Sequence, residues 1–185
     1  MQSMAEYHWV LGENGEAEHY LRQNLERLET SAPKSEEYAL ACHNYALFLV
    51  DQKAWDEASA LMERADRLLD PESEVWTTNA AALARAYAQL GRLEEADSLA
   101  KRALRAAKSL SSPIHSCELQ YFLGLLRLEE GAGEEAERHF ASALRHLQKF
   151  EHPLAKEAEL QQLQARALVM LAKEDEARDI LAKQL

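Results

Sequence analysis

The sequence predicts an all-α fold, an α-solenoid of about five stacked helix-turn-helix hairpins. Five alanines recur at intervals of 41, 38, 40 and 41 residues along the chain of 185. Each follows one or two acidic or glycine residues and opens an apolar run, and acids favour the positive end of a helix dipole. A period of roughly 20–50 residues indicates a repeat architecture, since a single hairpin cannot bury its own apolar faces. The alanines are Ala17, Ala58, Ala96, Ala136 and Ala177.

The predicted repeats follow one another along the chain. The first covers 1–31 with a turn at Gly12, and the second covers 36–70. The third covers 73–111, and its second helix is expected over Leu93–Ser109. The fourth and fifth cover 113–151 and 153–185. The breaks between them are short, so we expect a single domain over 1–185.

Two helix starts are expected at prolines. Asp70-Pro71 and Ser112-Pro113 each place a capping side chain before a proline that suits a first helical turn.

The fourth repeat shows the shared motif best. Leu123 and Gly124 precede a turn at 130–133, then two acids lead to Ala136, and Phe140 stands four residues further on. The second repeat has Tyr45-Ala46 with Leu49, Ala58 and Met62, and the third has Leu83-Ala84 with Tyr87 and Ala96. Small residues such as Ala84 and Ala96 are expected where two helices cross closely.

This motif resembles the tetratricopeptide repeat (TPR), which carries a Leu-Gly pair, an aromatic residue three further on, and an A-x3-F segment. The period of about 40 exceeds the common length of about 34 residues and is similar to the longer-helix kinesin light chain type. The resemblance covers almost the whole chain. It implies a right-handed superhelix whose concave groove binds a peptide or protein segment, as a scaffold or adaptor.

Composition limits the function classes. A net charge of -11 disfavours nucleic acid, whose phosphates require a basic face. No apolar run is long enough for a bilayer, and the N-terminus lacks the basic start of a secretion signal. Cys42 and Cys117 are expected too far apart for a disulfide, which fits a reducing, cytoplasmic location. The one basic cluster, Lys101 to Lys108, is interpreted as an exposed outer stripe.

The sequence carries no recognisable catalytic or cofactor motif. Its six glycines form no phosphate-binding set, and no G-x-S-x-G segment is present. His139 and His146 lack a third ligand at metal-site spacing, so they are expected to be solvent-exposed histidines on an outer helix. We therefore predict a protein that is not an enzyme and has neither cofactor nor metal.

The candidate peptide-binding residues are those that the TPR resemblance places on the concave face of the first helices. Amide and guanidinium groups there can bind a peptide backbone and carboxylates, and aromatic side chains can accept an apolar anchor. Ala81 and Ala82 stand where a clamp for a C-terminal carboxylate would need polar groups. The candidates are His43, Asn44, Leu47, Asp51, Arg85, Gln89, Tyr121, Phe122, Leu125, Gln162 and Arg166.

Alternatives remain at the level of the sequence. Tyr121, Phe122 and Leu125 can equally be packing residues between hairpins, and Arg85 and Arg166 can simply be solvated. Terminal repeats normally need a polar outer face, and apolar residues near the C-terminus, such as Met170, have no cover. The chain is therefore either a homo-oligomeric scaffold that assembles through its terminal repeats or a piece of a larger signalling or regulatory protein.

Overall fold

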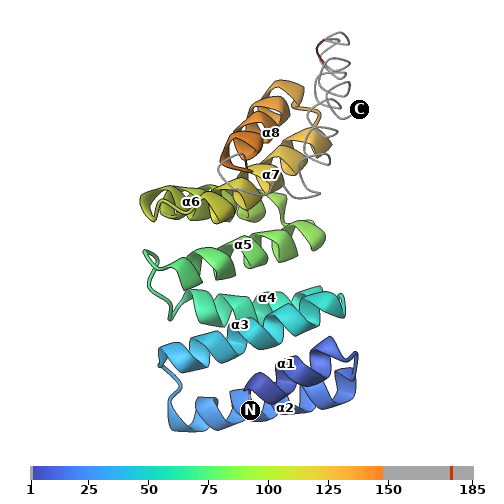
Figure 1. Ribbon diagram of the computed structural model, residues 1–185, viewed down its shortest axis with the longest axis vertical. Helices are drawn as coiled ribbons and strands as arrows, with labels where there is room; N and C mark the ends of the chain where they lie inside the picture. Colours follow the sequence, from blue (N-terminus) through green and yellow to red (C-terminus); the bar gives the residue numbers. More distant parts are fainter. Residues whose placement is uncertain (1, 148–175, 177–185) are drawn as a thin grey trace. The chain divides into compact units, whose positions relative to one another are not determined.

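The computed structural model describes residues 2–147 and 176 of the chain (Figure 1). Over 2–147 these residues form eight α-helices and no strand, as the sequence predicts. Successive helices alternate in direction, so they form antiparallel pairs. The helices are α1 (Gln2–Val10), α2 (Asn14–Ser31), α3 (Glu36–Asp51), α4 (Trp55–Asp66), α5 (Glu74–Gln89), α6 (Leu93–Ser109), α7 (Pro113–Glu129) and α8 (Gly133–Leu147).

The chain divides into two compact units, one over Met1–Ala96 and the other from Asp97 onward. In the first unit each of α1 to α5 packs on the next, and the first helices α3 and α5 also contact each other. In the second unit α7 packs along α8. The expectation of one domain over 1–185 stays a prediction.

The recurring alanines occupy buried positions. Ala17, Ala58, Ala96 and Ala136 are each 0% exposed, while Ala177 lies outside the described residues. In the α7–α8 hairpin the small residue opposite the alanine helix is Gly124. A Cβ atom added to it would come within 2.5 Å of the Phe140 ring, so the Leu-Gly and A-x3-F parts of the motif meet at one close crossing.

The turn inside each hairpin contains a residue with left-handed backbone geometry. Gly12, Gly91 and Gly131 all have φ of 75°, a region that glycine enters without a steric penalty. The α3–α4 turn places Lys53 at the corresponding point with φ of 59°. Because a side chain disfavours this conformation, the second hairpin has the most strained of these four turns.

The helix start expected at Asp70-Pro71 is wrong. Helix α5 begins at Glu74, and the Ser73 hydroxyl caps it by accepting from the Trp76 backbone N–H at 3.0 Å. The Asp70 carboxylate instead accepts from the Glu72 backbone N–H within the preceding turn, at 3.0 Å. Asp70 and Ser73 are both residue types that cap helices. Ser73 lies nearer the apolar run, and it is the one that caps α5.

The start expected at Ser112-Pro113 is confirmed in position, because α7 begins at Pro113. The Ser112 hydroxyl, however, contacts the His115 ring at 2.9 Å and not a backbone amide. No helix among the described residues is long and apolar enough to cross a bilayer.

Candidate functional site

In the first unit the candidate residues lie on two neighbouring helices, α3 and α5. Asn44, Leu47 and Asp51 follow one another at spacings of three and four, which places them on one face of α3. Asn44 and Leu47 are half-buried and Asp51 is exposed. This face therefore offers an amide, an apolar surface and a carboxylate.

Arg85 and Gln89 add two exposed polar side chains from α5, one turn apart. The Arg85 guanidinium makes no hydrogen bond or ion pair in the part of the chain that the structure describes. An exposed cation without a carboxylate is available to a ligand. The name inner surface is used below for Asn44, Leu47, Asp51, Arg85 and Gln89.

His43 does not belong to this surface, which corrects the sequence prediction. Its side chain is buried with 6% of its area exposed, and its Nδ1 lies 3.0 Å from Asn79 Oδ1. Asn79 Nδ2 donates to the Met62 carbonyl at 3.0 Å, so its Oδ1 accepts from His43 Nδ1–H. Burial lowers the pKa of His43, and the bond to Asn79 opposes this effect. A neutral His43 thus joins α3, α4 and α5 through their interior.

Trp9 is a residue of this region that sequence reasoning missed. Its Nε1–H donates to Asp51 Oδ2 at 2.9 Å, and its ring packs edge-on against Phe48 with centroids 5.7 Å apart. Trp9 therefore docks α1 on α3 and orients the Asp51 carboxylate. The contact joins residues 42 positions apart, and the only available signal was a tryptophan near the end of a short first helix.

In the second unit the aromatic candidates on α7 are largely packing residues. Phe122 is buried, with 9% exposed. Tyr121 and Leu125 are half-buried and pack against the cluster around Phe140, with the Tyr121 and Phe140 ring centroids 6.4 Å apart. Gln162 and Arg166 lie outside the described residues. The packing alternative therefore fits Phe122 best, while Tyr121 and Leu125 retain some exposed surface.

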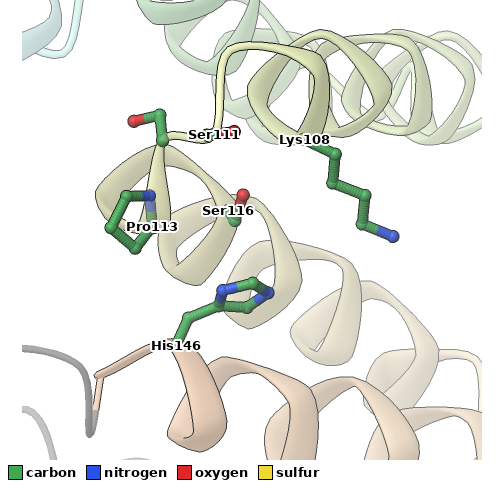
Figure 2. Close-up of a pocket in the computed structure, with 6 residues that line it drawn as sticks. Lys108, Ser111, Pro113, Ser116 and His146 are labelled. Atoms are coloured by element: carbon green, nitrogen blue, oxygen red, sulfur yellow. The ribbon is translucent and has the colours of Figure 1, made fainter.

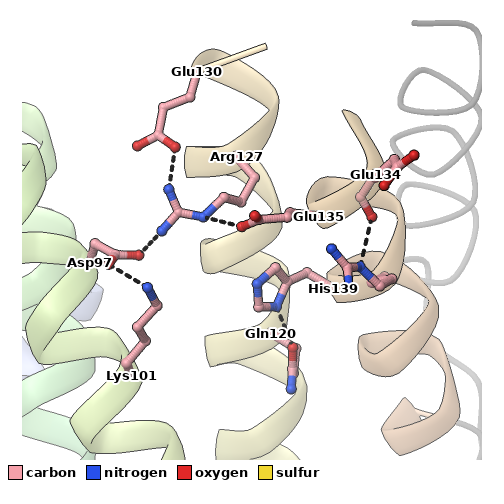
Figure 3. A network of polar contacts seen from close by, with 9 residues as sticks. Asp97, Lys101, Gln120, Arg127, Glu130, Glu134, Glu135 and His139 are labelled. Atoms are coloured by element: carbon pink, nitrogen blue, oxygen red, sulfur yellow. Dashed lines mark hydrogen bonds and ion pairs between the residues drawn. The ribbon is translucent and has the colours of Figure 1, made fainter. Parts of the chain in front are cut away.

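An ion-pair network that the sequence reasoning missed surrounds Arg127 (Figure 3). Its buried guanidinium pairs with Asp97 and Glu130 and lies 3.2 Å from the Glu135 carboxylate. Burial lowers the pKa of Arg127, but the bond to Glu130 and the nearby carboxylates outweigh it and raise the pKa. Arg127 follows Gly124 by three residues, as Tyr87 follows Ala84. The sequence did carry a signal for this network, because Arg127 is a cation at the position where the previous repeat has an aromatic residue.

The two histidines of α8 are not fully solvent-exposed, contrary to expectation. His139 is half-buried, and its Nδ1 lies 2.6 Å from Gln120 Oε1. His146 is also half-buried and lines a hollow of about 280 Å³ with Lys108, Ser111, Ser112, Pro113 and Ser116 (Figure 2). Histidines have apolar rings as well as polar atoms, and both sit where α8 meets α7.

The basic cluster of α6 is exposed, as the sequence predicts. Lys101, Arg102, Arg105 and Lys108 all lie at the surface. Lys101 pairs with Asp97 at 2.7 Å, one turn away on the same helix.

A second hollow lies on the α7–α8 hairpin. Its volume is about 480 Å³, and the described residues that line it are polar or charged. The lining residues are Gln120, Glu135, Arg138, His139, Ser142 and Arg145.

Solved structures show the same fold. The chain is similar to the crystal structure of BtubC (BKLC) from P. vanneervenii, with a TM-score of 0.87 and 18% identity over 97% of this chain and 74% of the other. Putative kinesin light chain TPR-like repeats from Podospora anserina give 0.83 and 19% over 98% and 90%. PilW, a type IV pilus biogenesis factor, gives 0.74 and 20% over 98% and 73%.

No protein-family model matches the sequence, and no curated protein matches it significantly. At these identities the structural likeness establishes the fold, which is a TPR-like repeat, and confirms the resemblance to the kinesin light chain type. The identity of a partner is a separate question.

Proposed function

We propose that the chain is a docking scaffold that binds a segment of another protein on the inner surface. The observation that carries the proposal is Arg85, an exposed cation that has no partner among the described residues. Its helix contacts the one that bears Asn44 and Leu47. The amide can bond to a peptide backbone, and the leucine can bury an apolar side chain. The TPR-like fold supports this, because its repeats place several first helices side by side.

Each residue of the inner surface has a distinct part in the proposal. Asn44 donates to and accepts from the main chain of the partner, and Arg85 and Gln89 bind its polar side chains. Asp51 is held by Trp9, so it is a fixed acceptor. No catalytic step is part of the proposal.

Affinity capture of binding proteins with a matched control tests it. The variant Asn44→Ala/Leu47→Ala/Arg85→Ala removes the central contacts, and Arg27→Ala/Glu57→Ala/Arg67→Ala alters three exposed residues on α2, α4 and the α4–α5 connection. We expect proteins captured by the wild type and by the control to be lost from the inner-surface variant. Circular dichroism checks that helicity is equal in all three. Equal capture by both variants would contradict the assignment of the surface.

A second candidate function is a self-assembling scaffold, and α1 favours it. Met4, Tyr7, Val10 and Leu11 are 45%, 59%, 87% and 54% exposed, an unusual density of large apolar side chains on one short stretch. The occupant proposed for this stretch is α1 of a second copy. Sedimentation equilibrium should show a dimer that Tyr7→Glu/Val10→Glu converts to a monomer. A strictly monomeric wild type at high concentration would exclude this candidate.

A further inference from the structure

The α7–α8 hollow concentrates basic side chains on one helix face. Glu135, Arg138, Ser142 and Arg145 of α8 follow one another at steps of three, four and three residues, which keeps them on the same side, and His139 lies one turn after Glu135. Arg138 and Arg145 are two turns apart, about 10 Å along the axis, with Ser142 between them. Both arginine side chains can therefore bend toward one point above Ser142.

The two arginines are free of carboxylates within the described part of the chain. Arg138 Nε donates to the backbone carbonyl of Glu134 at 3.2 Å, which positions its guanidinium without neutralising it. Arg145 makes no hydrogen bond or ion pair there. In a chain with net charge -11, two exposed arginines without an acid partner among residues 2–147 are unusual.

Among the described residues that line the hollow Glu135 is the one acid, and it already has a cation partner. The Glu135 carboxylate lies 3.2 Å from Arg127 Nε, and Arg127 is held in turn by Asp97 and Glu130 (Figure 3). Arg127 therefore partly neutralises Glu135, and Arg138 and Arg145 give the described lining of the hollow a net positive charge.

His139 and Gln120 supply oriented polar groups. His139 Nδ1 lies 2.6 Å from Oε1 of Gln120, which is buried with 6% exposed. Because an amide oxygen accepts, Nδ1–H of His139 donates to Gln120, and Nε2 is the ring nitrogen that remains for a ligand. Burial lowers the pKa of His139, the positive charges of Arg127 and Lys101 lower it further, and Glu135 and Asp97 raise it. A bound anion would favour the protonated ring, whose Nε2–H is a donor.

We propose that the α7–α8 hollow is a binding site for a phosphate group, either free phosphate or a phosphate monoester. Two guanidinium groups, the Ser142 hydroxyl and the His139 ring line this one hollow. A phosphate carries its acceptor oxygens in a tetrahedral arrangement, so one phosphate can accept from two guanidinium groups, a hydroxyl and an imidazole at the same time. The proposal is independent of the inner surface.

Isothermal titration calorimetry at low ionic strength tests it with three probes: inorganic phosphate, a phosphoserine peptide and the same peptide without phosphate. The site variant is Arg138→Gln/Arg145→Gln. The control is Arg105→Gln/Lys108→Gln, which removes the same charge from exposed residues of α6 and alters the hollow around His146. All four positions are exposed, so helicity and unfolding temperature should be unchanged.

We expect the wild type and the control to bind phosphate with one site per chain, and the site variant to bind at least about tenfold more weakly. Chemical shifts of the His139 ring should move on titration of the wild type and of the control, and not of the site variant. Saturation by free phosphate alone assigns the site to the free anion, and tighter binding of the phosphopeptide assigns it to a phosphorylated protein. No phosphate binding by the wild type, or equal weakening in the control, would overturn the proposal.

Discussion

Replacing Gly124 by alanine tests the close crossing of α7 and α8. A Cβ atom at this position would lie 2.5, 2.7 and 2.9 Å from Cε1, Cδ1 and Cζ of Phe140. Phe140 is 0% exposed and belongs to the buried cluster of the hairpin, so its ring has little room to move. Either the ring leaves its preferred rotamer or the helices separate, and both cost packing energy.

The magnitude follows from two opposing effects. Overpacking a buried site costs about 1–3 kcal/mol, while alanine is a better helix former than glycine by about 1 kcal/mol. We therefore expect Gly124→Ala to lower the free energy of unfolding by up to about 2 kcal/mol. Urea denaturation followed by circular dichroism measures the loss, and an unchanged m-value shows that the unfolded state is comparable.

Gly15 provides the matched control for Gly124. It lies in α2, and a Cβ atom added there would meet nothing within 4 Å. Gly15→Ala should therefore be neutral or stabilising by up to about 1 kcal/mol.

Relief of the contact provides a second test. Phe140→Leu removes the ring that the new methyl group would meet, so the double variant Gly124→Ala/Phe140→Leu should lose less than the sum of the single losses, by about 1 kcal/mol. Additive losses, or a Gly124→Ala protein as stable as Gly15→Ala, would refute the close crossing as the reason for glycine.

Four further outcomes follow from the contacts described. Arg127→Met should lower the free energy of unfolding by about 1–2 kcal/mol in urea denaturation, because Glu130 and Glu135 lose their cation while Asp97 keeps Lys101; an unchanged value would show that the network contributes nothing. Because the folded pKa of His43 is lowered, the unfolded chain binds a proton first, and stability should fall as pH drops below about 6.5. His43→Gln should have a shallower slope of unfolding free energy between pH 7 and 5, and an equal slope would contradict the assignment. Trp9→Phe should raise hydrogen exchange of α1 amides about fivefold, because the bond to Asp51 contributes about 1 kcal/mol; unchanged exchange would mean that α1 is docked by other contacts. Lys53→Gly should raise the unfolding temperature through relief of the left-handed turn, and a lower temperature would contradict the strain.

The sequence was sufficient for the fold because the repeat is a property of small residues at fixed spacing. The bounds of Leu93–Ser109 are confirmed residue by residue, and Ala96 and Ala136 are fully buried as expected. Both results depend on periodicity, which tertiary contacts reinforce. The start at Asp70 is wrong because local capping signals are degenerate: Ser73 offers the same chemistry closer to the apolar run.

The site was less predictable because it depends on partners far apart in sequence. A histidine at position 43 fits an exposed face and a buried polar pair equally well, and only Asn79, 36 residues later, decides between them. Asp51 was predicted on the concave face, and the sequence did not indicate that Trp9 from another helix donates to its carboxylate. Arg85 lies exposed on α5, and whether it binds a partner stays a prediction.

A polar side-chain contact joins successive hairpins within each unit, and the residue types that make it change along the chain. In the first unit Tyr45 donates to Glu18 at 3.1 Å, and Tyr87 donates to Glu63 at 3.0 Å. In the second unit Arg127 binds Asp97 in the corresponding way.

In each case a polar side chain of a first helix reaches an acid on the preceding second helix. The contact can change from a phenol to a guanidinium because the small residues nearby, and not the polar pair, set the helix spacing. Positions that fix the architecture therefore repeat, while polar positions vary and are available for recognition. This division supports placing the functions on Arg85, Arg138 and Arg145, cations that have no acid partner among residues 2–147.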